Sequence, residues 1–301
     1  MQTKDRELLR GLAERYAELA HHEVQKKRLE RYYATNALAA PRPVVLIDEV
    51  PWGEIRDEAL VLRSSAPELQ GIEGRLRRAL YQWDHWQADF VILPAFRVTK
   101  RVESSGIGLE VKESLIRSET GTYAASHRYV DQLAGEADLE RLQCPMLRYD
   151  RDATEREADV AREIFDGLLP VEVVGTTFSY NIWDRIASLR GVDALLMDLA
   201  VRPDFMHRTA RRFADIGIAT LRQLVELDLL DTAPIILHCT PACSRELPAA
   251  DYAGTVRPKD VWGRCAAQIF SAVSPAMHDE FDLAYNQEIF GGCGLLYYGC
   301  C

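Results

Sequence analysis

The chain lacks the sequence features of several protein classes. No uninterrupted apolar run reaches the roughly 18 residues that a membrane-spanning helix needs, and Met1 to Arg6 contain no apolar core of the signal-peptide kind. Basic residues are not in excess, because the formal net charge is -10 and nucleic-acid scaffolds need clustered Lys and Arg. We therefore expect a cytoplasmic protein with no membrane or nucleic-acid partner.

The cysteines are odd in number. The seven cysteines cannot all pair with one another, and a reducing compartment disfavours structural disulfides. Metal binding and plain burial remain as their roles. The sequence has no Gly-x-Gly-x-x-Gly fingerprint either, so the dinucleotide-binding version of an α/β fold has no support.

One stretch brings an imidazole and two thiols together. Pro234 to Leu237 is an apolar run, and His238, Cys239 and Cys243 follow it within six residues. This layout is typical of a buried parallel strand that carries ligands at its carboxyl end, where α/β proteins place their chemistry. Because strand side chains alternate, His238 and Cys239 cannot both point to the same face, and Cys239 can instead be packing.

The end of the sequence repeats the arrangement. The apolar run that begins at Leu295 ends in the adjacent thiols of Cys300 and Cys301. We expect this strand to lie beside the one that ends at His238, so that His238, Cys243, Cys300 and Cys301 are the candidate ligands of one metal ion. The remaining thiols, Cys144, Cys265 and Cys293, are expected to be buried.

The periodicity of the chain predicts alternating strands and helices. Apolar spacings of three and four predict amphipathic helices over residues 7–36, 68–87, 152–168, 182–189 and 203–230, with further helices at 259–270 and 275–290. Strand-like runs occupy 44–48, 90–98, 170–178, 234–238 and 295–301, and residues 194–199 read as strand or buried helix. Residues 103–149 have weak periodicity and suggest a hairpin excursion or a lid.

This order implies right-handed crossovers and a parallel sheet. We expect an α/β fold of the TIM (β/α)8-barrel type, incomplete at its carboxyl end, with a doubly wound sheet as the alternative. The expected domains are an N-terminal helical extension with the first strand, residues 1–88, and a barrel domain, residues 89–301. The strand-like run that ends at Cys301 also suggests that the chain is part of a longer one.

Several segments carry a recognisable pattern, namely Leu8–Ala17, Arg42–Trp52, Leu189-Arg-Gly191 with Met197-Asp-Leu199 and Pro203, and Gln268–Phe281. Together they resemble the uroporphyrinogen decarboxylase superfamily. Leu237-His-Cys-Thr-Pro241 and Tyr297-Tyr-Gly-Cys-Cys301 resemble a branch of it that is similar to the cobalamin-dependent methyltransferases. The resemblance implies a TIM barrel, and relatives continue past the Gly-Cys-Cys.

The resemblance also implies a cofactor and a partner. In the methyltransferases, zinc is held by a His-x-Cys motif on one strand and by a later cysteine. Here Cys300 falls at the cysteine position of that motif, and Tyr298 stands where histidine is expected. The implied activity is transfer of a methyl group between a small methylated substrate and the corrinoid of a separate small protein, because this chain has no Asp-x-His-x-x-Gly signature of its own.

Two carboxylates are candidates for acid or base chemistry beside the metal. Glu280 begins a polar interruption in the helix after Pro275, and Asp198 follows an apolar run that could be a strand. A carboxylate in either place could exchange a proton with the substrate or orient a metal ligand.

Two other functions stay open. Uroporphyrinogen decarboxylation needs no metal but needs a cationic pocket, and the Arg-Ala-Gly-Arg motif of that enzyme is absent, with only Arg97, Lys100 and Arg101 as basic residues in its place. A noncatalytic barrel that serves as a scaffold or corrinoid-protein partner is the remaining alternative.

Overall fold

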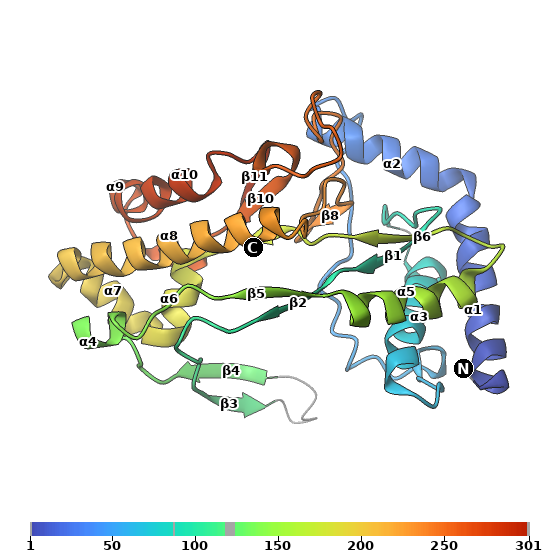
Figure 1. Cartoon of the computed structure of the whole chain (residues 1–301), viewed down its shortest axis with the longest axis horizontal. Coiled ribbons are helices and arrows are strands. Elements are labelled where there is room, and N and C mark those ends of the chain that lie inside the picture. Colours follow the sequence, from blue (N-terminus) through green and yellow to red (C-terminus); the bar gives the residue numbers. More distant parts are fainter. Residues whose placement is uncertain (1, 87, 118–123, 300–301) are drawn as a thin grey trace. The chain divides into compact units, whose positions relative to one another are not determined.

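The computed structural model describes residues 2–86, 88–117 and 124–299, and it has a mixed α/β architecture (Figure 1). The chain forms two compact units, each built from three stretches of sequence. The first unit contains residues 1–101, 150–175 and 233–245, and the second contains residues 102–149, 176–232 and 246–301. The expected boundary at residue 88, between an N-terminal extension and a barrel, is not tested by this division into units and stays a prediction.

Helices dominate the first unit. Its elements are α1 (Thr3–His21), α2 (Glu23–Asn36), η1 (Glu58–Leu60), α3 (Pro67–His85), β1 (Phe96–Thr99), α5 (Arg151–Phe165), β6 (Val171–Val174), β8 (Ile236–Leu237) and β9 (Thr240–Pro241). β1 and β6 pair in parallel, with Phe96 opposite Val171. The predicted helices are confirmed, whereas residues 44–48 form no strand and residues 90–98 form one only from Phe96 onward.

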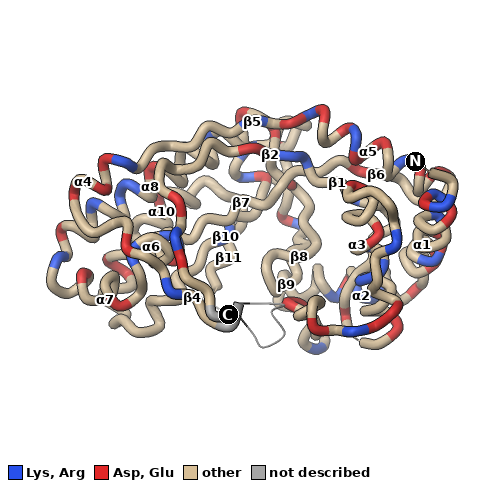
Figure 2. The backbone as a smooth tube through the Cα atoms, turned by 90° about the horizontal axis from the view of Figure 1, so that it is seen from below, with Lys and Arg blue, Asp and Glu red and all other residues tan. Residues whose placement is uncertain are grey.

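The core of the first unit lies where α1, α3 and α5 meet β1. Leu9 of α1 and Leu76 of α3 are fully buried, and the rings of Phe96 and Phe165 stack with centroids 4.4 Å apart. Pro67 begins α3 at the first helical position, where its missing N–H costs nothing. On the outside, Lys and Arg alternate with Asp and Glu along α1 and α5, as Figure 2 shows.

The second unit contains the longest helix and a parallel sheet. Its strands are β2 (Arg101–Ser104), β3 (Glu113–Arg117), β4 (Ala124–Tyr129), β5 (Leu147–Asp150), β7 (Phe178–Ser179), β10 (Trp262–Cys265) and β11 (Leu295–Tyr298). β3 and β4 form an antiparallel hairpin, which confirms the expected excursion, and β2 pairs with β5. The three-stranded sheet has the order β11-β10-β7, all parallel.

Helices cover this sheet. They are α4 (Glu136–Leu139), α6 (Ile182–Arg190), α7 (Val192–Val201), α8 (Pro203–Glu226), η2 (Pro258–Asp260), η3 (Gln268–Ala272), α9 (Pro275–His278), the π-helix η4 (Asp279–Leu283) and α10 (Ala284–Phe290). α10 packs along α8 (Figure 1). Trp183 and Phe213 are fully buried in the core, and Gly191, with φ +85°, ends α6 in a conformation that favours glycine.

The structure corrects one predicted helix, because residues 259–270 were expected to be helical but 262–265 form β10. Residues 194–199, which read as strand or buried helix, are helical and lie within α7. The described strands form sheets of two or three, so the α/β class is confirmed at the coarse level and the barrel stays a prediction. Within the described ranges, no helix is both long and apolar enough to cross a bilayer.

The buried carboxylate of Glu73 fixes the segment before α3. It accepts hydrogen bonds from the backbone N–H of Arg63 (2.9 Å) and Ser64 (2.8 Å), from Ser64 Oγ (2.5 Å) and from Arg77 Nε (2.7 Å). Burial alone would raise the pKa of Glu73, but the hydrogen bonds from Ser64, Arg77 and Arg63 outweigh it, so the pKa is lowered.

We predict that Glu73→Gln lowers the free energy of unfolding by about 3–5 kcal/mol at neutral pH, because it leaves the buried Arg77 without its charged partner. A lowered pKa stabilises the fold above the unfolded-state value of about 4.3, so the difference from wild type should shrink as the pH falls below it. Urea unfolding across pH measures this, with exposed Glu54→Gln as the control. A pH-independent difference would contradict the account.

Candidate active site

Polar side chains gather where the parallel strands β7, β10 and β11 end. Cys265 of β10 is opposite Tyr298 of β11, and Arg264 is opposite Ser179 of β7. Parallel strands bring their carboxyl ends to one edge, which is where α/β proteins place their sites. The carboxyl-end cluster, as we name it, consists of Ser179, Asp184, Arg264, Cys265, His278, Asp282 and Tyr298.

The carboxylate of Asp282 is the centre of this cluster. Its side chain is fully buried, at the π-helical turn η4. Tyr298 Oη donates a hydrogen bond to Asp282 Oδ2 (2.6 Å), and His278 Nε2 lies 3.4 Å from the same oxygen and also contacts Tyr298 Oη. Single π-helical turns inside a helix are frequent at functional sites, because they change the direction of side chains.

These contacts connect three groups that exchange protons. When Asp282 is ionised, Tyr298 donates its hydroxyl hydrogen to the carboxylate. The Nε2–H of His278 must then donate to the phenol oxygen of Tyr298. Tyr298 is partly exposed, at 36%, and so is His278. A proton can therefore pass between solvent and the buried carboxyl group through His278 and Tyr298.

Burial determines the charge of the cluster. It raises the pKa of Asp282, and the hydrogen bond from Tyr298 and the nearby His278 lower that pKa only in part. The pKa of Tyr298 is raised by burial and by its bond to Asp282. Asp184 also has a raised pKa, again because it is buried, although Gln268 N–H donates to its Oδ1 (3.2 Å). These groups therefore keep their protons to a higher pH than they would in water.

The second unit also concentrates its unsatisfied polar atoms here. Among the described residues of this unit, the buried side-chain atoms without a hydrogen-bond partner are Asn181 Oδ1, Arg264 Nε, Asp282 Oδ1, and the amide N and O of Asn286. Asn286 lies four residues after Asp282 on the same helical segment. Buried polar atoms are normally hydrogen-bonded. An edge with several unpaired polar atoms is therefore a candidate site for a ligand that would supply the missing hydrogen bonds.

A pocket of about 370 Å³ adjoins the cluster. Ser179 lines the pocket and accepts a hydrogen bond from Arg264 (2.8 Å), so it joins the two. Most of the lining is apolar, including Leu109 and Phe178. Arg185 supplies a cation, which lies 4.5 Å from the ring centroid of Tyr180. This pocket suits a small apolar molecule with an acidic group.

The stretch of residues 234–243, by contrast, is not a buried parallel strand. β8 pairs in antiparallel with β9, and His238 lies in the turn between them with φ +56°. The prediction of a strand that ends at His238 beside β11 is therefore wrong at the level of pairing, because the hydrogen-bonded neighbour of β11 is β10. The apolar run is one arm of a hairpin, and its Ile236 is exposed rather than buried.

Two of the four candidate metal ligands lie in the first unit. His238 Nδ1 is 3.7 Å from Glu49 Oε1. The Cys243 thiol is buried, lies 3.9 Å from the carbonyl oxygen of Ile235, and has its pKa raised by burial to about 11. Without a metal ion this thiol keeps its proton, and a zinc ion would displace that proton on binding the thiolate. The ligand role of Cys243 stays a prediction.

The other two candidate ligands, Cys300 and Cys301, lie outside the described residues. Within residues 2–86, 88–117 and 124–299, no three His, Cys, Asp or Glu side chains are grouped to hold a metal ion. The described residues thus do not fit zinc by themselves. Three other thiols were expected to be buried. Cys265 is buried, Cys293 is partly buried, and Cys144 is exposed.

The two candidate carboxylates pair with residues outside the cluster. Asp198 is buried inside α7 rather than at a strand end, and its Oδ2 binds Arg190 (2.7 Å) and Arg202 (3.4 Å). Glu280 is exposed and pairs with His207 (3.0 Å). Asp282, two residues after Glu280, is the buried acid instead. The sequence held a signal for it, since His278 and Asp282 are four residues apart and share a helical face.

Comparisons of the chain with protein-family models, curated proteins and solved structures give no significant match.

We predict that Asp198→Asn lowers the free energy of unfolding by roughly 1.5–3 kcal/mol, because it weakens charged hydrogen bonds to two arginines. Glu280→Gln should change it by less than about 1 kcal/mol, since that pair is exposed. Thermal or urea unfolding of the two variants measures both. If Asp198→Asn kept full stability, its ion pairs would not be structural, and the catalytic assignment would regain support.

We also predict that Tyr298→Phe raises the pKa of Asp282 further, because it removes the hydrogen bond that favours the ionised form. Carbon-13 NMR of the labelled aspartate carboxyl groups, followed against pH, measures the shift. Tyr297→Phe is the control, since its side chain points to the opposite face of β11. An unchanged or lower pKa in Tyr298→Phe would contradict the proposed bond.

Proposed function

We propose that this chain is an enzyme of the uroporphyrinogen decarboxylase superfamily type with a TIM-type (β/α) fold, whose active centre is the carboxyl-end cluster. The observation that carries the proposal is the buried Asp282, which is bonded to Tyr298 and lies next to His278 at the edge of a parallel sheet. The segment Gln268–Phe281, which carries part of the family resemblance, ends one residue before it. The parallel pairing of all three strands supports the fold.

The reaction we propose is transfer of a methyl group between a small substrate and a corrinoid on a separate protein. In the forward direction, the reduced cobalt supplies the electron pair for the new bond to carbon. The bond between that carbon and a heteroatom of the substrate breaks, and the heteroatom keeps its pair and takes a proton. Protonated Asp282 supplies that proton through Tyr298 and His278, and in reverse its carboxylate accepts it.

The remaining residues of the site would bind the substrate. The adjoining pocket, about 370 Å³, holds the apolar body, and Arg185 faces an acidic group. Zinc would be held by thiolates of Cys300 and Cys301, which directly follow β11, and it would act as a Lewis acid. The zinc part of the proposal rests on the sequence motifs alone.

The same cluster favours one other candidate, the metal-free decarboxylation of the uroporphyrinogen decarboxylase type. In that reaction a carbon–carbon bond breaks, carbon dioxide leaves, and a proton takes its place on carbon. A neutral carboxylic acid and a phenol within hydrogen-bond distance are suitable proton donors for it. The absence of the Arg-Ala-Gly-Arg motif places this candidate second.

Metal analysis combined with two assays separates these functions. Methyl transfer predicts one zinc ion per chain that is lost in Cys300→Ser, together with methylation of added reduced cobalamin by a methylated substrate. Cys144→Ser, which changes an exposed thiol, should keep the zinc. A metal-free protein that releases carbon dioxide from uroporphyrinogen would overturn methyl transfer in favour of decarboxylation. A stable protein with neither activity would be a scaffold.

A further inference from the structure

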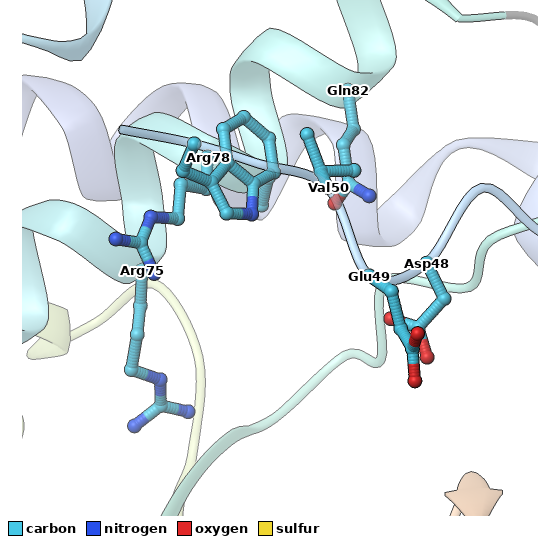
Figure 3. A pocket seen from close by; sticks show the side chains of 8 residues that line it. Asp48, Glu49, Val50, Arg75, Arg78 and Gln82 are labelled. Atoms are coloured by element: carbon cyan, nitrogen blue, oxygen red, sulfur yellow. The ribbon is translucent and has the colours of Figure 1, made fainter. Parts of the chain in front are cut away.

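The first unit contains a charged pocket that the proposed reaction does not use. It measures about 490 Å³ and lies between α3 and the loop of residues 48–52. Figure 3 shows Arg75 and Arg78 of α3 on one side of the opening, and Asp48 and Glu49 of the loop on the other. Trp52, Val50, Ala79 and Gln82 complete the lining.

The charges of this pocket do not pair with each other. Among the described residues, no ion pair joins Arg75 or Arg78 to Asp48 or Glu49. Arg78 has its guanidinium over the ring of Trp52, 5.5 Å from the centroid, and forms no ion pair with any residue that the structure describes. The carboxylate of Asp48 has no hydrogen-bond partner in the same described part of the chain. One positive and one negative group therefore face the pocket unneutralised.

Neighbouring contacts hold the other two charged groups in place. Arg75 donates to the carbonyl oxygen of Arg97 (2.8 Å), and its guanidinium lies 4.2 Å from the ring centroid of Phe96. Glu49 has φ +40°, a region that residues other than glycine rarely adopt, and its carboxylate lies 3.7 Å from His238 Nδ1. The pocket thus has a positive side and a negative side, and one charged group on each side has a neighbouring contact.

This charge distribution selects among ligands. A simple anion would be attracted by Arg75 and Arg78 but repelled by Asp48 and Glu49. A simple cation would be attracted by the two acids and repelled by the two arginines. A molecule with a carboxylate at one end and an ammonium group at the other satisfies both sides. The ring of Trp52, which packs against Tyr81 and Trp86, gives an apolar wall for the carbon atoms between them.

We propose that this pocket binds a small zwitterion, with its carboxylate on Arg78 and Arg75 and its ammonium group toward Asp48 and Glu49. His238 then lies beside this pocket, because its Nδ1 is 3.7 Å from Glu49 Oε1. The volume suits a molecule of amino-acid size, since ligand pockets begin at about 300 Å³. The assignment concerns binding alone and does not depend on the reaction proposed for the second unit.

Calorimetric titration of the full chain at low ionic strength tests the proposal. The probes are glycine, 3-aminopropionate and 4-aminobutyrate, which differ in the separation of their charges, with butyrate and butylammonium as singly charged comparisons. We expect at least one zwitterion to bind at least about tenfold more tightly than either comparison, since one charged contact is worth about 1.4 kcal/mol or more. Equal binding of butyrate would overturn the proposal, as would binding of no zwitterion.

Variants assign the binding to this pocket. Arg78→Gln and Asp48→Asn should each weaken the zwitterion at least about tenfold. Arg56→Gln and Glu54→Gln are matched controls, because they remove the same charges close by in the sequence but line no part of the pocket, and they should leave binding unchanged. Circular dichroism verifies that each variant is folded. Unchanged binding in Arg78→Gln or Asp48→Asn would place the ligand elsewhere and refute the assignment.

Discussion

The burial of one carboxyl group, that of Asp282, constrains how β11 and the π-helical turn of the second unit are arranged. Moving a carboxylate out of water costs free energy unless hydrogen-bond donors of the protein replace the solvent. Here the donors come from two different elements, because Tyr298 belongs to β11 and His278 precedes the π-helical turn. Both elements must therefore form before the carboxyl group is satisfied, and the partial compensation leaves it inclined to carry a proton.

The register of the sheet and the phase of the helix follow from this requirement. If β11 shifted by one residue against β10, Tyr297 would take the place of Tyr298 and every side chain of the strand would change face. The π-helical turn over Asp279–Leu283 has the same kind of effect, because its wider turn directs Asp282 inward while Glu280 remains exposed. The indole N–H of Trp183 stabilises the turn by donating a hydrogen bond to the carbonyl oxygen of Phe281 (3.1 Å).

The sequence predicted the helices better than the strands or the site. Leu69, Ile72, Leu76 and Leu80 recur every three or four residues, and they are the buried face of α3. Short strands carry a weaker signal. The run Pro234–Leu237 is as apolar as a core strand, yet it forms a hairpin arm, because the turn at His238 and Cys239 reverses the chain. β10 was missed for the opposite reason, since Trp262–Cys265 contains Gly and Arg.

The candidate site could be predicted only in part. The sequence directed attention to the carboxyl ends of strands, and β11 ends at Tyr298, two residues before Cys300 in the sequence. The residues chosen there were those with metal-ligand chemistry, whereas the described part of the site is made of oxygen and imidazole groups that only tertiary structure brings together. The local signal for Asp282 is its four-residue spacing from His278, and this spacing does not reveal that the carboxyl group of Asp282 is buried while that of Glu280 is exposed.

The turnover number of Asp282→Asn tests the central claim most directly. The substitution keeps the shape of the side chain and removes only its ability to carry the transferred proton. The account predicts a loss of about a hundredfold or more, the usual contribution of an acid or base catalyst, in a protein with unchanged unfolding behaviour. A folded Asp282→Asn enzyme with wild-type turnover would contradict it.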